Sequence, residues 1–148
     1  DEYLTPICSP MLLTGSKPLS EPADLKHHTL LHDFSTLDWR RWMKIAGVKD
    51  VNLNNGPVFS HSAMVLQAAI HGQGVALGHS VLAQADIQAG RLVRPFSLIL
   101  PSNDGYDFIC PDGWVERPKI AAFRQWLLDI IAKEKAKDPF ANLVEEDA

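Results

Sequence analysis

The chain lacks the features that mark several classes of protein. Its two cysteines, Cys8 and Cys110, are too few for the disulfide framework of a small secreted domain, and they favour a reducing cytoplasm. No apolar run approaches the ~18 residues of a membrane span, so we expect no membrane partner. The 14 lysines and arginines are outnumbered by 18 aspartates and glutamates, which is not typical of a free-standing nucleic-acid-binding domain.

The hydrophobic content and the patterning of the chain predict one core of the α/β class. Hydrophobic residues make up 46% of the 148 positions, a length close to one domain. Strand-length apolar runs alternate with segments of helical periodicity, which predicts a largely parallel sheet with helices packed on its faces. The clearest helix begins at Pro118 and carries apolar residues at three- and four-residue spacing: Ile120, Phe123, Leu127 and Ile130.

Three further local patterns in the sequence bear on the core, on a change of direction of the chain and on the extent of the protein. The Trp39, Trp42 and Met43 stripe is interpreted as core packing, and the two cysteines as buried, inert thiols. Asp104-Gly105 between apolar runs predicts either a hairpin or a crossing between two lobes. The sequence begins at Asp1 without Met and without a signal peptide, so we expect it to be part of a longer cytoplasmic protein.

The most informative segment is a predicted strand, a serine-rich helix start, a glycine turn and a second apolar strand. Its helix starts near Ser60 and Ser62. Free backbone N–H groups and the positive end of the dipole at a helix N-terminus suit a carboxylate or another small anion. The alternative is that these serines simply cap the helix, because serine is among the preferred N-cap residues.

Several other functions find little support. Gly72-Gln73-Gly74 follows a helix and precedes a strand, the reverse of a dinucleotide-binding fingerprint. The six histidines lack the spacing of a zinc site, so we expect no metal and no cofactor. A hydrolase could be assembled from Ser62, His79 and Asp104, but no G-x-S-x-G elbow marks a nucleophile, and we expect no catalytic residues.

These segments together resemble the C-terminal, effector-binding region of LysR-type transcriptional regulators, in the branch of the glycine-cleavage and β-lactamase activators. The resemblance spans about residues 4–132. The segments that carry it are Pro6-Ile7-Cys8-Ser9-Pro10, Pro22-Ala23-Asp24-Leu25, the Trp39-Trp42 helix, the helix from Ser62 with its Gly72–Leu77 return, Gly90–Phe96, Phe108-Ile109-Cys110-Pro111 and the Phe123–Leu128 helix.

The resemblance implies a fold like that of type 2 periplasmic binding proteins, in which two α/β lobes hold a small effector between them. Residues 1–95 would form the second lobe, with a mixed sheet flanked by helices. Residues 96–135 would return to the first lobe and add its C-terminal helix, and 136–148 would form a flexible acidic tail. The rest of the first lobe and the winged helix-turn-helix that binds DNA are absent from this sequence.

The resemblance also implies the residues of the pocket. On the second-lobe side they are Ser60, His61 and Ser62, at a strand end and the following helix start. Gly78 and His79 end the next strand and would face the same cleft. Two further candidates are Tyr106, near the crossing between lobes, and Phe34.

The implied function is regulatory rather than enzymatic. A small-molecule co-inducer would control how a homodimer or higher oligomer presents DNA-binding domains that lie outside this chain. The alternative from another functional class is a solute-binding protein of similar fold, which would need a signal peptide. Because half of the pocket is missing, we expect this chain alone to bind effector weakly or not at all.

Overall fold

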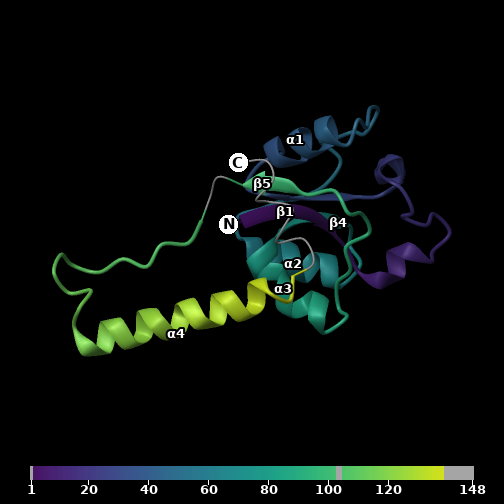
Figure 1. Cartoon of the computed structure of the whole chain (residues 1–148). Coiled ribbons are helices and arrows are strands. Elements are labelled where there is room, and N and C mark those ends of the chain that lie inside the picture. The colour runs from purple at the N-terminus through teal and green to yellow at the C-terminus, as the bar shows by residue number, and fades with distance from the viewer. Residues whose placement is uncertain (1, 103–104, 139–148) are drawn as a thin grey trace. The chain divides into compact units, whose positions relative to one another are not determined.

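The computed structural model describes residues 2–102 and 105–138, which belong to two compact units, Glu2–Ser102 and a second from Asn103 onward (Figure 1). The first unit contains β1 Glu2–Ile7, β2 Leu30–Asp33, β3 Val58–Phe59, β4 Val75–His79, β5 Leu100–Ser102, α1 Leu37–Ile45, α2 Ser62–Ile70 and α3 Ser80–Gln88, with short 3₁₀ helices at Pro10–Leu13 and Pro22–His27. The described part of the second unit contains α4, Pro118–Lys135.

The five strands form one mixed sheet in the order β3-β2-β4-β1-β5. Strand β2 runs parallel to β3 and β4, whereas β1 runs antiparallel to β4 and β5. Four strands therefore end at the same edge of the sheet, which is also the edge where β1 begins. The predicted α/β fold with a mixed sheet flanked by helices is confirmed, and β1 is the strand that makes it mixed.

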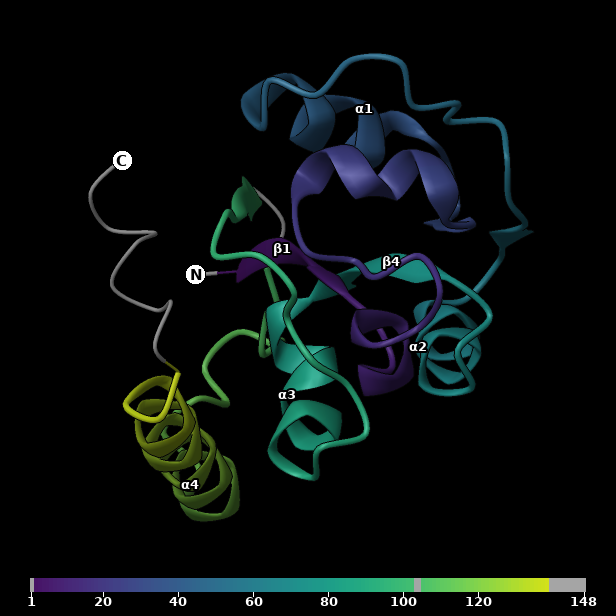
Figure 2. The same ribbon diagram turned by 90° about the vertical axis from the view of Figure 1, so that its right-hand side faces the viewer.

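Each face of the sheet is covered by helices. Figure 2 shows α1 over one face and α2 and α3 over the other. On the α1 face, Trp39 and Trp42 pack among strand residues such as Leu30 and Val75. Trp39 Nε1 donates to Leu31 O (3.1 Å) and Trp42 Nε1 to Leu98 O (3.3 Å), so both buried indoles keep a hydrogen bond. The prediction that this stripe forms core is confirmed.

The opposite face is built from smaller residues. The buried cluster there joins strand residues to the inner sides of α2 and α3, and its members are Ile7, Leu31, Val65, Leu66, Ala68, Ala69, Ala76, Ala83 and Leu92. Cys8 is fully buried beside β1, and burial raises the pKa of its thiol to about 11. An inert thiol at this position is what the sequence predicts.

The segment after α3 is less regular than its sequence suggests. The apolar runs over 91–96, 97–100 and 106–110 predict three strands, but the first two form only an isolated bridge between Val93 and Cys8 and the short strand β5. Pro95 lacks the N–H that a ladder needs. No strand occurs over 106–110, where Phe108 instead packs its ring on Phe123 of α4, with centroids 5.6 Å apart.

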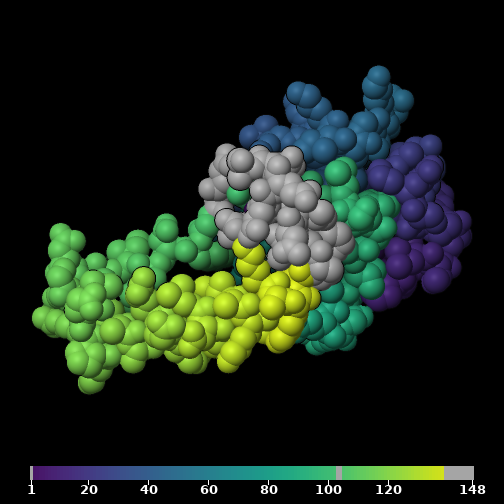
Figure 3. All heavy atoms as spheres, viewed as in Figure 1, coloured from purple at the N-terminus to yellow at the C-terminus, as the bar shows by residue number. Residues whose placement is uncertain are grey.

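The predicted helix from Pro118 is confirmed as α4, but none of its residues is buried. Large apolar side chains that remain exposed in this unit include Ile109, Phe123, Trp126, Leu128 and Ile131. In Figure 3 the atoms of α4 and of the segment before it run from green to yellow. No helix within residues 2–102 or 105–138 combines the length and apolarity needed to cross a bilayer.

Candidate functional site

The edge where the parallel strands end brings several predicted site residues together. Ser62, Gly78 and His79 line one cavity with Asp33, the last residue of β2. Ligands of open α/β sheets bind outside the carboxyl ends of the strands, which is where these residues lie. The cavity measures ≈ 10 Å³, about the space of one water molecule, so a larger ligand would rest on this edge rather than inside it.

The N-terminus of α2 is open at this edge. His61 is the N-cap residue, in an extended conformation, and makes no side-chain cap hydrogen bond. A hydrogen bond of 2.9 Å joins the Ser60 hydroxyl to His61 Nδ1. The backbone N–H groups of Ser62 and Ala63 find no acceptor among the described residues. The alternative that Ser60 and Ser62 cap the helix is therefore wrong, and the helix end keeps free donors and its positive dipole.

The neighbouring helix α3 begins at the same edge, and a buried carboxylate lies at its N-terminus. Glu2 is 3% exposed, and its Oε1 accepts hydrogen bonds from Ser80 Oγ (2.7 Å) and Val81 N (3.3 Å). A carboxylate at this position satisfies the first turn and complements the helix dipole. At α3 a carboxylate therefore accepts from one first-turn N–H, whereas no side chain accepts from the first turn of α2.

Asp33 adds an acceptor beside the open helix end. Its Oδ2 lies 4.0 Å from His79 Nε2, and its Oδ1 is buried without a hydrogen-bond partner. No lysine or arginine lines this cavity. Sequence reasoning missed Asp33. The signal that could have found it is its place as the last residue of a strand, next to a helix start on the same edge.

The remaining predicted residues are placed as follows. Gly78 is buried, and a Cβ added to it would lie 2.2 Å from Ile7 Cδ1, so packing requires glycine at this position. His61 is exposed beside Ser60. Phe34, 69% exposed, follows Asp33 directly, whereas Tyr106, 66% exposed, belongs to the second unit. That Gly78, His61, Phe34 and Tyr106 contact a ligand stays a prediction.

The sequence raised two other kinds of site, a metal centre and a hydrolase. Within residues 2–102 and 105–138, no group of three His, Cys, Asp or Glu side chains is arranged to hold a metal ion. Asp104, the third member of the hydrolase alternative, lies outside the described residues. His28 and His32 lie on the body of the lobe, and burial lowers the pKa of both imidazoles.

The chain is similar in sequence to known transcriptional activators. The glycine cleavage system transcriptional activator of Escherichia coli (strain K12) is 56% identical over 139 residues, which are 94% of this chain and 46% of that protein. The homologous activator of Haemophilus influenzae is 37% identical over 135 residues, 91% of this chain and 44% of the relative. The chain thus spans less than half the length of these relatives.

A solved structure is similar as well. The effector domain of the transcriptional regulator AmpR of Pseudomonas aeruginosa superposes with a TM-score of 0.65 at 28% identity, covering 89% of this chain and 62% of that one. The family described as LysR substrate binding domain matches residues 1–132. The resemblance stated from the sequence is confirmed, and the chain belongs to the LysR substrate-binding domain family.

Proposed function

We propose that this chain is the effector-sensing part of a LysR-type transcription regulator and that it binds a small co-inducer at the carboxyl edge of its sheet. The observation that carries the proposal is the uncapped N-terminus of α2 at that edge. Family membership and the names of the relatives, which are transcriptional activators, support it. Regulation of this kind requires binding and no catalytic step.

The site suggests the polarity of the effector. Free N–H groups at Ser62 and Ala63 suit an anionic group or another hydrogen-bond acceptor. The Asp33 carboxylate suits a hydroxyl or amine donor on the same molecule. Ser60, His61 and His79 would complete the polar contacts on this side, and Gly78 lines the same cavity as His79. Tyr106 and Phe34 remain effector-binding candidates.

The regulatory step follows from binding thermodynamics. An effector shifts a protein between two arrangements only by its difference in affinity for them. In the proposed mechanism the two arrangements differ in how paired copies of the whole protein, as a homodimer or higher oligomer, present their DNA-binding parts. Those parts lie outside this chain, and such a protein acts in the cytoplasm, where it meets DNA.

We propose the following division of the chain, although β5 (Leu100–Ser102) pairs with β1 in the first unit. Residues 1–95 would be the second lobe, 96–135 the return to the first lobe with its last helix, and 136–148 an acidic tail, of which 139–148 lie outside the described residues. In support, α4 has no buried residue, although Phe123 and Trp126 lie on it. We infer that these apolar side chains pack against the part of the first lobe that the relatives contain and this chain lacks.

The proposal is tested with the variant Ser62→Asp in the longer protein. A carboxylate in the first turn of α2 complements the dipole and occupies the place proposed for the effector's acceptor group. Thermal shift with a panel of small hydroxy and amino acids identifies compounds that stabilise the unchanged protein. We expect Ser62→Asp to abolish the stabilisation by those compounds.

The matched control is Lys119→Asp, which places a carboxylate in the first turn of α4 and should leave the ligand response intact. Chromatin immunoprecipitation of the tagged longer protein tests the DNA-linked part of the proposal, because a solute-binding protein would enrich no DNA. A panel whose stabilisation survives Ser62→Asp unchanged, or a protein that enriches no DNA, would contradict the proposal.

A further inference from the structure

The segment that contains α1 collects positive charge. Four of the eight lysines and arginines in residues 2–102 lie within residues 37–50, where the only acids are Asp38 and Asp50. The whole chain has the opposite balance, with 14 basic and 18 acidic residues. The four cations, all of them exposed, are Arg40, Arg41, Lys44 and Lys49.

The buried side of α1 holds the helix against the sheet. Its three buried side chains belong to the core, and they are Trp39, Trp42 and Met43. Both indoles also donate hydrogen bonds to backbone carbonyls of neighbouring segments, which fixes the rotation of the helix about its axis. The opposite side of α1 is therefore presented to solvent in a defined orientation.

Two rows of side chains make up the solvent side of α1. Leu37, Arg41 and Ile45 follow one another at four-residue spacing, so they form one row along the helix surface. Arg40 and Lys44 have the same spacing and form a second row beside the first. Cations and large apolar side chains are therefore neighbours on this surface.

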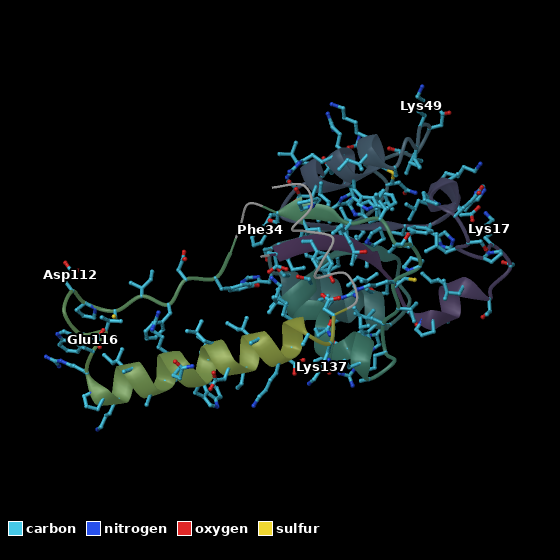
Figure 4. The ribbon with its side chains drawn as sticks, in the orientation of Figure 1. Lys17, Phe34, Lys49, Asp112, Glu116 and Lys137 are labelled. Carbon is cyan, nitrogen blue, oxygen red and sulfur yellow. The ribbon has the colours of Figure 1, made fainter. Side chains whose placement is uncertain are left out.

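Most of the positive charge is not neutralised within the chain. Lys49 follows the helix and projects outward from the first unit in Figure 4; it and the two rows form what we call the cationic face of α1. Arg41 Nη1 lies 3.4 Å from Asp38 Oδ1 in an exposed ion pair. Arg40, Lys44 and Lys49 make no ion pair with a carboxylate of residues 2–102 or 105–138. The helix dipole accounts for a cation in the last turn, which is Lys44, but not for Arg40 or Lys49.

Two exposed apolar side chains indicate what kind of molecule fits the cationic face. Leu37 is 61% exposed and Ile45 51%, and they lie on either side of Arg41 in the first row. The phosphates of DNA would match the cations but would leave these two side chains uncovered. A membrane surface takes up a continuous apolar stripe, and that of α1 is already buried in the core. A protein segment can offer both carboxylates and apolar side chains.

We propose that the cationic face of α1 is a docking surface for an acidic segment of a partner protein, one that carries apolar side chains between its carboxylates. Clusters of arginine recognise acidic motifs through charge-assisted hydrogen bonds. The carboxylates would meet Arg40, Lys44 and Lys49, and the apolar side chains would cover Leu37 and Ile45. None of these residues lines the cavity at the carboxyl edge, so the inference does not depend on the effector site.

The test uses two short synthetic peptides of equal charge. In the first, leucines alternate with pairs of glutamates, and in the second, serine replaces each leucine. Amide chemical-shift titration of the ¹⁵N-labelled chain measures both affinities and locates the contact. The leucine peptide should shift the amides of residues 37–50 and should bind about tenfold more tightly than the serine peptide, because it also buries apolar surface.

Two double variants separate the contributions of charge and apolar contact. Arg40→Glu combined with Lys44→Glu should weaken the binding of both peptides about tenfold, because it reverses the charge of the second row. Leu37→Ser combined with Ile45→Ser should lower the affinity for the leucine peptide to that for the serine peptide. All four positions are exposed, so the spectrum outside residues 37–50 should show an unchanged fold.

The matched control is Lys17→Glu combined with Lys26→Glu, which makes the same change in charge at exposed positions outside the cationic face and should leave the preference for the leucine peptide intact. Equal affinities for the two peptides, or unchanged binding after reversal of Arg40 and Lys44, would overturn the proposal. Tighter binding of a short DNA duplex would assign the face to nucleic acid instead. Shifts of the same amides when the chain alone is concentrated would assign it to a second copy, which also overturns the proposal.

Discussion

Ser80 Oγ donates a 2.7 Å hydrogen bond to Glu2 Oε1, although 78 positions separate the two residues in sequence. The bond ties the first strand of the sheet to the first turn of α3. Glu2 also pairs with Ser102 across β1 and β5, where the first unit ends. The buried carboxylate of Glu2 therefore links β1, which pairs with β5, to the start of α3 at the candidate effector edge.

Replacing Glu2 with alanine should destabilise the chain. The change leaves Ser80 Oγ and Val81 N without their acceptor and removes the cap of α3, a loss of about 1–3 kcal/mol. Urea unfolding followed by circular dichroism measures it. Glu116→Ala is the control, because Glu116 is exposed in the second unit and its removal should change the free energy of unfolding by less than ~0.5 kcal/mol. Equal effects of the two variants would contradict the capping role.

Tryptophans on the two units should respond differently to the same substitution. Trp42→Phe deletes the hydrogen bond to Leu98 O and part of a fully buried ring, so we expect a loss of about 1–3 kcal/mol in the free energy of unfolding. Trp126→Phe, on the exposed side of α4, should cost less than ~0.5 kcal/mol. Chemical denaturation of both variants measures the two losses in the free energy of unfolding. A large loss in Trp126→Phe would indicate a buried core around α4, where the described residues show none.

Local patterns predicted much of this fold. The apolar spacing from Pro118 marked α4, and the Trp39–Trp42 stripe marked the buried face of α1, because helical periodicity and burial act within a few residues. The order of the segments placed Ser62 and His79 at one edge, since the carboxyl ends of parallel strands meet there. The LysR resemblance supplied the family, which physical reasoning from the residues alone did not reach.

Features that depend on distant contacts were missed. Nothing local to Glu2 indicates that it caps α3, because its partner is near position 80. Asp33 was overlooked for a similar reason, since its proximity to His79 depends on the pairing of β2 with β4. The left-handed backbone of Phe34, with φ +56°, could not be read from sequence either, because phenylalanine rarely adopts a positive φ.

Stability should decrease as the solution becomes acidic. Burial lowers the pKa of His28 and His32 below the ordinary value of 6.5, so the unfolded chain binds more protons than the folded one in that range. The free energy of unfolding should fall as pH decreases from 6.5 through the folded-state pKa values and should be constant above about pH 7.5.

Urea titrations between pH 7.5 and 5 measure this slope. His32→Leu removes one of the two imidazoles whose pKa is lowered and should make the slope shallower, whereas His71→Gln, at an exposed position, should leave it unchanged. A slope that is the same in His32→Leu and in the unchanged chain would exclude His32 as a source of the pH dependence.

A methyl group added at Gly78 should conflict with Ile7. The Cβ would lie 2.2 Å from Ile7 Cδ1 and 2.9 Å from Ile7 Cγ1, so Gly78→Ala should lower the free energy of unfolding by about 1–3 kcal/mol. Ile7→Val removes Cδ1 and alone should cost about 0.5–1.5 kcal/mol. In the double variant the two costs should not add, because the valine vacates the space that the new methyl needs. A double-mutant cycle by urea unfolding measures the coupling. Strict additivity would show that Gly78 is required for another reason, such as close approach of a ligand to the backbone of β4.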